Sequence, residues 1–178
     1  MPERTLLLVE DEAVIAMMEA AMLRDNGYAV LVAASGAEAV ALASEDLTID
    51  LVLMDIDLGR GMDGTDAARE ILARRNIPVV FLSSHTEPVV VEKTEGITSY
   101  GYVVKNSGDT VLLASMKMAF RLYEANRTLD ENRRRLSEAN QIMSGILENT
   151  HMMAAYLDTS FNFIWVNGTY AATCGRDP

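Results

Sequence analysis

Short apolar runs alternate with helical segments over the first 120 or so residues, and this alternation limits the possible folds more than any other feature. The apolar runs lie at residues 5–9, 28–32, 49–54, 77–82 and 100–104. Such runs are typical of strands that are buried on both faces of a sheet. Because helical segments separate them, we expect an α/β fold in which five parallel strands are covered by helices on both faces.

The segments between the runs carry helix signals of different kinds. The first has an apolar stripe of Val14, Met17, Met18, Ala21 and Met22, and it ends at Asn26-Gly27. Ser35 and Glu38 have the spacing of a capping box, which predicts a helix from there to about Ser44. Further helices are expected at 65–74, at 86–96 and from Asp109 onward.

Polar side chains follow four of the five runs directly. They are Glu10 and Asp11 after the first run, Asp55 after the third, Ser83 after the fourth and Lys105 after the fifth. In a parallel sheet the ligand site lies beyond the carboxyl ends of the strands. We therefore expect three carboxylates, one hydroxyl and one ammonium to meet at one edge of the sheet.

This set of side chains predicts a chemistry. Clustered carboxylates repel one another, and a hard divalent cation such as Mg²⁺ relieves that repulsion. Asp55, at the end of the middle strand, is the predicted nucleophile on phosphorus, in the manner of an aspartyl phosphate. Lys105 would neutralise phosphoryl charge, and Ser83 would donate a hydrogen bond to a phosphoryl oxygen, with Ser84 as the alternative donor.

The last of these helices is predicted to continue well beyond a compact domain. Between Asp109 and Asn149 there is no proline, and Gly145 is the only glycine. A seven-residue repeat places Leu122, Leu129, Leu136 and Met143 on one seam, with Ala125, Asn132, Ala139 and Ile146 three residues further on. The pattern predicts a two-stranded coiled coil over 121–148 and hence a homodimer, with Asn132 selecting register and partner number.

A different pattern follows residue 150. Strand-like segments at 153–157 and 161–166 flank Asp158-Thr159-Ser160, which predicts a hairpin, and a short helix is expected from Asn167. These elements are too few to bury a core, so the chain is expected to end inside a further domain. The expected division is therefore 1–120, 121–148 and 149–178.

Composition excludes several classes of function. There are 26 acidic and 15 basic residues, a formal net charge of −11, which argues against a nucleic-acid partner. Cys174 is the only cysteine, so neither an intrachain disulfide nor a cysteine zinc finger is expected. The chain has no signal-like start and no run of 18 apolar residues, so no membrane span is expected and a cytoplasmic location is predicted.

Five motifs together resemble the receiver (CheY-like) domain of two-component response regulators, which has a flavodoxin-like fold. They are LLVEDE at 7–12, LMDI at 53–56, MDG at 62–64, VFLSSH at 80–85 and GYVVK at 101–105. The resemblance implies that Asp55 accepts a phosphoryl group from a phosphohistidine on a histidine kinase or phosphotransfer protein. It also implies that Glu10, Asp11, Asp55 and the backbone carbonyl of Asp57 hold Mg²⁺, and that Ser83 and Tyr102 form a switch pair.

The chain departs from the receiver pattern at two places. Asn106 follows Lys105 where the family usually has proline, and the loop at 57–64 is one residue longer than usual. Residues 142–178 resemble the beginning of a PAS sensor domain. Together the resemblances imply a phosphoacceptor switch with no enzymatic activity of its own, within a longer protein that carries a histidine-kinase region.

Two alternatives belong to other functional classes. One is a phosphatase-like hydrolase with an aspartate nucleophile, which would use Asp57, two residues after Asp55, as general acid. Such enzymes usually carry the nucleophile after the first strand and have a cap domain, and neither feature is found in this sequence. The other alternative is a dimerisation scaffold whose acidic site is idle.

Overall fold

The computed structural model of the protein describes residues 4–59, 61–84, 97, 100–105, 107–149 and 151–174. The helix expected at 86–96, His85, the Lys105-Asn106 peptide and the segment 175–178 lie outside these residues. The chain divides into two compact units, Met1–Asn126 and Arg127–Pro178.

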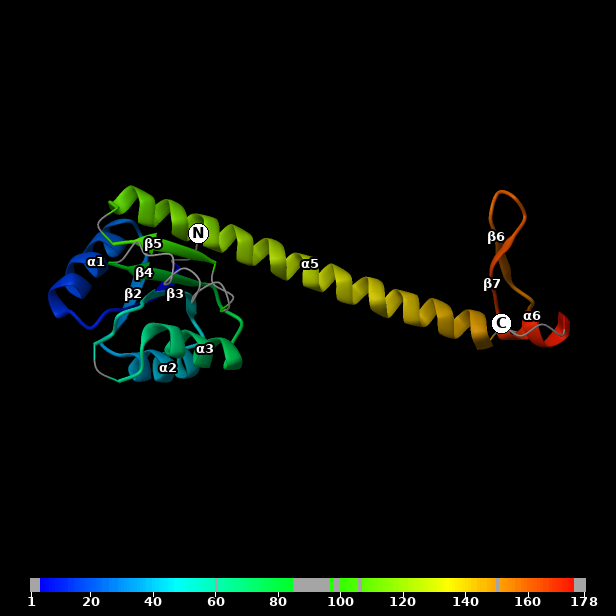
Figure 1. Ribbon diagram of the computed structural model, residues 1–178, viewed down its shortest axis with the longest axis horizontal. Coiled ribbons are helices and arrows are strands. Elements are labelled where there is room, and N and C mark those ends of the chain that lie inside the picture. Colours follow the sequence, from blue (N-terminus) through cyan, green and yellow to red (C-terminus); the bar gives the residue numbers. More distant parts are fainter. Residues whose placement is uncertain are drawn as a thin grey trace. The chain divides into compact units, whose positions relative to one another are not determined.

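The first unit contains the predicted parallel sheet. Its strands are β1 (Thr5–Val9), β2 (Ala29–Ala33), β3 (Ile49–Asp55), β4 (Val79–Ser83) and β5 (Gly101–Val104). They pair in the order β2-β1-β3-β4-β5, and every pairing is parallel. The five-stranded α/β sheet is therefore confirmed. β3 lies at its centre between β1 and β4, and helices cover both faces (Figure 1).

The sheet separates two apolar layers. α1 (Ala13–Asp25) and the first turns of α5 (Asp109–Asn149) pack on one face, and α2 (Gly36–Glu45) and α3 (Gly64–Arg74) pack on the other (Figure 1). Side chains alternate along each strand, so Leu6 and Leu8 of β1 join the α1 and α5 layer. The intervening Leu7 and Val9 join the α2 and α3 layer. Burial on both faces explains the apolar runs of the inner strands β1, β3 and β4.

The apolar stripe predicted for α1 is not its buried face. Val14, Met17 and Met18 are about 70% exposed, and the fully buried side chains are Ala16, Ala20 and Leu23. Both sets have helical spacing. Met17 and Met18 therefore face away from the core, whereas Met22, on the same stripe, is partly buried and packs against it.

Residues 112–124 of α5 are held against the sheet. Met116 and Phe120 are buried in the core. The Tyr123 hydroxyl donates to the backbone oxygen of Asn76 at 2.8 Å, and the guanidinium of Arg4 lies 3.9 Å from the centre of the Phe120 ring. Arg4 also forms an ion pair with Glu124 at 2.8 Å. The long helix predicted from Asp109 is present and continues to Asn149.

The second unit contains the rest of α5 and a hairpin. β6 (Ala155–Leu157) and β7 (Phe163–Val166) pair antiparallel, as predicted, and α6 (Gly168–Cys174) follows. Many apolar side chains of the hairpin are exposed. In the part of the chain that the structure describes, no helix is both long enough and apolar enough for a membrane crossing.

Candidate functional site

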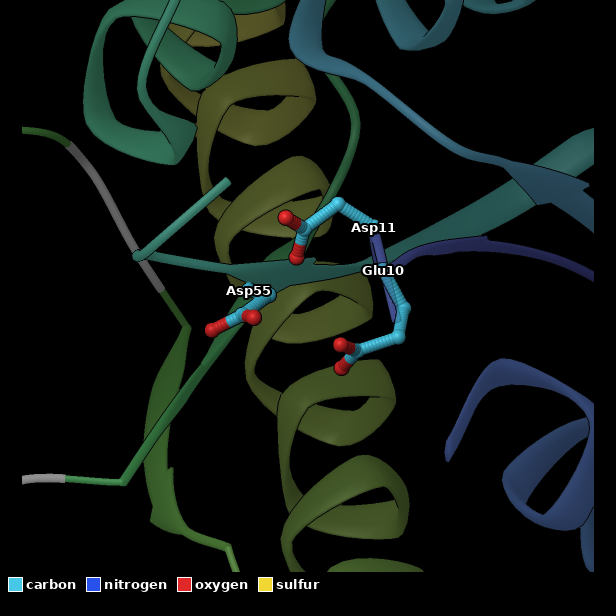
Figure 2. Close-up of side chains that lie close together, drawn as sticks. All are labelled: Glu10, Asp11 and Asp55. Carbon is cyan, nitrogen blue, oxygen red and sulfur yellow. The ribbon is translucent and has the colours of Figure 1, made fainter. Parts of the chain in front are cut away.

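Three carboxylates meet where the neighbouring strands β1 and β3 end. Glu10 and Asp11 follow β1, Asp55 is the last residue of β3, and one ligand oxygen from each lies within 4.8 Å of the others (Figure 2). Glu10 and Asp55 are buried, whereas Asp11 is exposed. The arrangement follows from strand register. Val9 pairs with Met54, so the residues that follow them, Glu10 and Asp55, lie side by side.

Lys105, the residue after β5, contacts the carboxylate cluster. Its ammonium nitrogen donates to Glu10 Oε2 at 2.5 Å and to Asp55 Oδ2 at 2.7 Å, and its side chain is only 8% exposed. Its backbone N–H donates to the backbone oxygen of Ser83 at 2.7 Å, which fixes the chain at the end of β5 against β4. A single ammonium thus bridges two of the three carboxylates.

Burial sets the electrostatics of the cluster. It raises the pKa of the carboxyl groups of Glu10 and Asp55, and hydrogen bonds from Lys105 offset part of each shift. For Lys105, burial lowers the ammonium pKa, but the hydrogen bonds to Asp55 and Glu10 outweigh burial and the pKa is raised. Since one ammonium faces three carboxylates, the cluster retains an excess of negative charge.

Glu19 is a site residue that the sequence reasoning missed. Burial, together with the nearby negative charge of Glu10, raises the pKa of its carboxyl to about 7. Its Oε2 atom is buried and has no hydrogen-bond partner. Glu19 belongs to no motif. It could have been found only from its position beside Ala16, Ala20 and Leu23 on the buried face of α1.

The remaining predicted residues lie around the same edge. The backbone N–H of Asp57 donates to Asp55 Oδ1 at 3.3 Å. Ser83 is fully buried at the end of β4, one residue beyond Leu82, which pairs with Asp55. Ser84 is exposed. Tyr102 is half-buried and packs against the core layer of α2 and α3, opposite Phe81 in the strand register.

The glycine of the MDG motif has a steric role. A Cβ atom on Gly64 would lie 1.8 Å from the backbone oxygen of Asp55, a distance that no side chain can adopt. The Gly64 N–H donates to the backbone oxygen of Ile56 at 3.0 Å. The start of α3 can therefore pack directly against the end of β3, which carries Asp55.

The predicted dimer seam lies on the exposed surface of α5. The exposed fractions of its apolar residues run from 45% at Leu122 to 65% at Leu129. Leu136, Met143 and Asn132 are exposed as well. The intrahelical ion pairs Arg127–Glu131 and Arg134–Glu138 involve none of the seam residues.

The donor set at the edge of the sheet fits a magnesium ion. Mg²⁺ prefers oxygen ligands from one or two carboxylates together with water molecules. Glu10, Asp11 and Asp55 supply such oxygens, and the exposure of Asp11 leaves the cluster open to water on one side. A cation there would also offset the negative charge that Lys105 leaves uncompensated.

Comparison with known proteins places this site in a family. The sequence profile of the response regulator receiver domain matches residues 6–117. The chain belongs to the response regulator receiver family. The matched range contains Glu10, Asp11, Asp55, Ser83 and Lys105.

Relatives of this receiver chain are regulatory proteins. Transcriptional regulatory protein PdtaR of Mycobacterium tuberculosis is 34% identical over 157 residues, which cover 84% of this chain and 76% of PdtaR. Phyllosphere-induced regulator PhyR of Methylorubrum extorquens is 39% identical over 83 residues, 46% of this chain and 31% of PhyR. Both names describe regulators.

Solved structures agree with the assignment to the receiver family. The N-terminal domain of a response regulator/sensory box/GGDEF 3-domain protein from Carboxydothermus hydrogenoformans is 48% identical, with a TM-score of 0.64, and the match covers 68% of this chain and 98% of that one. Chemotaxis protein CheY4 of Vibrio cholerae is 25% identical with a TM-score of 0.62, covering 66% and 98%.

Proposed function

We propose that the chain is a phosphorylation-controlled signalling switch in which Asp55 accepts a phosphoryl group from a histidine kinase or phosphotransfer protein. The observation that supports it most directly is the position of Asp55 within the carboxylate cluster, 2.7 Å from the Lys105 ammonium. A carboxylate oxygen of Asp55 would attack phosphorus, and the phosphoryl group would leave the donor's imidazole.

Each neighbouring residue has a proposed role in this transfer. Lys105 neutralises negative charge on the phosphoryl oxygens, and Ser83 donates a hydrogen bond to one of them, with Ser84 as the alternative. Glu10, Asp11, Asp55 and the Asp57 carbonyl would hold Mg²⁺. When bound, Mg²⁺ would supply further neutralisation of the phosphoryl charge.

The switch would involve Ser83 and Tyr102. These residues lie on adjacent strands, since Ser83 pairs with Val104 and Tyr102 pairs with Phe81. Recruitment of the Ser83 hydroxyl by the phosphoryl group would open space into which the Tyr102 ring rotates. Phosphorylation adds charge at this edge, so the packing around Tyr102 would differ between the two states.

The output of the switch is proposed to pass through α5. Residues 121–148 would pair with a second copy as a parallel coiled coil, between a receiver domain at 1–120 and the start of a PAS domain at 149–178. The exposed leucines of the seam support pairing. In the complete protein a histidine-kinase region would follow, as in hybrid sensor kinases.

Phosphoryl uptake by two isosteric variants tests the proposal. Asp55→Asn is expected to abolish incorporation from acetyl phosphate with Mg²⁺ present, because the amide cannot act as nucleophile. Asp57→Asn, a matched change two residues away, keeps its backbone carbonyl and is expected to be labelled normally. Labelling of Asp55→Asn at full stoichiometry would refute the nucleophile assignment.

The same two variants separate the phosphatase alternative from the switch. An aspartate-nucleophile hydrolase would turn over p-nitrophenyl phosphate repeatedly and would lose that activity in Asp57→Asn. The proposed switch retains its phosphoryl group and shows no such dependence on Asp57. Mg²⁺ binding separates the scaffold alternative. The switch would bind Mg²⁺ and lose that binding when Asp11 or Asp55 is neutralised, whereas an idle scaffold would show no such binding.

A further inference from the structure

Gly59 lies unusually close to the side chain of Asp11. It follows β3 in the loop that leads to α3, and its φ of +58° is in the left-handed region. A Cβ atom placed on Gly59 would lie 2.7 Å from Asp11 Oδ2 and 3.8 Å from Asp11 Cγ. A carbon and a carboxylate oxygen do not approach to 2.7 Å in proteins, so any side chain at position 59 would displace this oxygen.

The displacement would alter the acidic site more than it would alter the fold. Asp11 is exposed and its carboxylate is the free end of a short side chain, so rotation away from residue 59 costs little packing. The same carboxylate supplies one of the ligand oxygens that gather within 4.8 Å of those of Glu10 and Asp55. A rotated Asp11 would no longer complete that group.

We propose that Gly59 is a positioning residue for the cation site, where the absence of a side chain holds open the place of the Asp11 carboxylate. This inference rests on the proposed function, in which Glu10, Asp11 and Asp55 bind Mg²⁺. On this proposal the loop between β3 and α3 influences cation affinity through Gly59, and not through a carboxylate ligand of its own.

Gly61 provides a matched control in the same loop. Its φ is +112°, so a substitution there strains the backbone too, but a Cβ atom at that position would meet no atom within 4 Å. Asparagine provides a second control, because it tolerates the left-handed conformation that Gly59 adopts. Gly59→Asn therefore adds the Cβ atom with little backbone strain, whereas Gly61→Ala adds strain without the contact.

The experiment is a calorimetric Mg²⁺ titration of the whole chain and of Gly59→Ala, Gly59→Asn and Gly61→Ala, with thermal unfolding measured without metal. We expect both position-59 variants to bind Mg²⁺ at least about tenfold more weakly, a loss of about 1.4 kcal/mol. Gly61→Ala is expected to stay within about twofold of the wild type. The unfolding temperature of Gly59→Asn should change little.

The outcomes distinguish the inference from the function on which it rests. If the wild type binds Mg²⁺ and the position-59 variants bind it equally well, the role of Gly59 is overturned and the proposed function stands. Equal weakening in Gly61→Ala would also overturn it, because loop strain would then be the cause. A wild type that neither binds Mg²⁺ nor takes up phosphoryl would refute the proposed function itself.

Discussion

The ammonium nitrogen of Lys105 lies 2.7 Å from Oδ2 of Asp55, so the candidate nucleophile is paired with a buried cation before any phosphoryl group arrives. The same nitrogen donates to Glu10. Removal of this cation would leave two buried carboxylates without their shared partner, which is strongly destabilising. The contact therefore couples the stability of the fold to the chemistry proposed for the site.

Lys105→Met is expected to reduce both stability and phosphoryl uptake. At pH 7 the free energy of unfolding should fall by about 3 kcal/mol, because the buried carboxylates lose their counter-charge. Since burial raises the pKa of Glu10 and Asp55, they take up protons as the pH falls, and the deficit should shrink toward pH 4. Denaturant unfolding of both proteins at several pH values measures this loss of stability and its pH dependence.

Phosphoryl uptake by Lys105→Met should fall about 100-fold, the typical cost of removing one group that stabilises transition-state charge. Lys117→Met, which changes an exposed lysine of α5, is the control. Uptake equal to that of the wild type would contradict the role proposed for Lys105, whatever happens to stability.

Glu19→Gln is expected to stabilise the protein in a pH-dependent way. The Glu19 carboxyl has a pKa of about 7 in the folded chain, against an ordinary value of 4.5. Below pH 4.5 the group is protonated in both the folded and unfolded states, so the substitution should have little effect. As the pH rises from 4.5 through 7, the unfolded chain loses this proton first, and the wild type loses stability.

Above pH 7 the variant should be more stable by on the order of 1–2 kcal/mol, less than the full shift implies because Glu19 is partly exposed to solvent. Unfolding in EDTA at pH 4, 6 and 8 tests this expectation without metal. If the free energy of unfolding differs between Glu19→Gln and the wild type by the same amount at all three pH values, the substitution changes packing and not ionisation.

The sequence predicted those parts of the fold that depend on local pattern. Each apolar run became a strand, and because parallel strands end at one edge, the positions of Glu10, Asp55 and Lys105 could be inferred from the residues that follow the runs. Their proposed chemical roles stay predictions. The N-cap of α2 also depends on a local pattern, and Ser35 accepts a hydrogen bond from the Glu38 N–H as expected.

The features that the sequence did not reveal depend on how elements pack. The spacing of Met17 and Met18 favoured them as the buried face of α1, but Ala16, Ala20 and Leu23 are the side chains that the helix buries. The raised pKa of Glu19 arises from the same packing. The approach of Gly59 to Asp11 depends on a left-handed backbone conformation within a loop, which no periodic pattern encodes.

The seam of α5 predicts self-association. Leu129 and Leu136 are about 65% exposed in the single chain, and pairing would bury both. The double variant Leu129→Asp/Leu136→Asp is expected to sediment as a monomer at concentrations where the wild type is a dimer. Arg127→Ala/Arg134→Ala is the control, because these residues form intrahelical ion pairs and belong to no seam position.

Asn132 should fix the register of this pairing. An asparagine at one core position of a coiled coil selects alignment at some cost in stability. Asn132→Leu is therefore expected to tighten association while allowing other registers or larger oligomers, which sedimentation of the same samples would resolve. A wild type that is monomeric at all concentrations would contradict the seam altogether.

Asn167 holds the second unit together through its side chain. It is fully buried, and its Nδ2 donates to the backbone oxygens of Leu147 and Met152 at 2.9 Å each. Its Oδ1 accepts from the N–H groups of Ala154 and Tyr170. One side chain therefore joins the end of α5, the segment before β6 and the start of α6.

Asn167→Ala is expected to loosen this junction without unfolding the receiver domain. Each lost hydrogen bond contributes about 1 kcal/mol, so hydrogen exchange at the Ala154 and Tyr170 amides should accelerate at least about tenfold. Asn162→Ala, which removes an exposed hydrogen bond to Asp158 in the same unit, is the matched control. Amides of β3 should exchange at the wild-type rate in both variants, because that strand lies in the first unit. Unchanged protection at Ala154 and Tyr170 would show that the hairpin and α6 keep their places without Asn167.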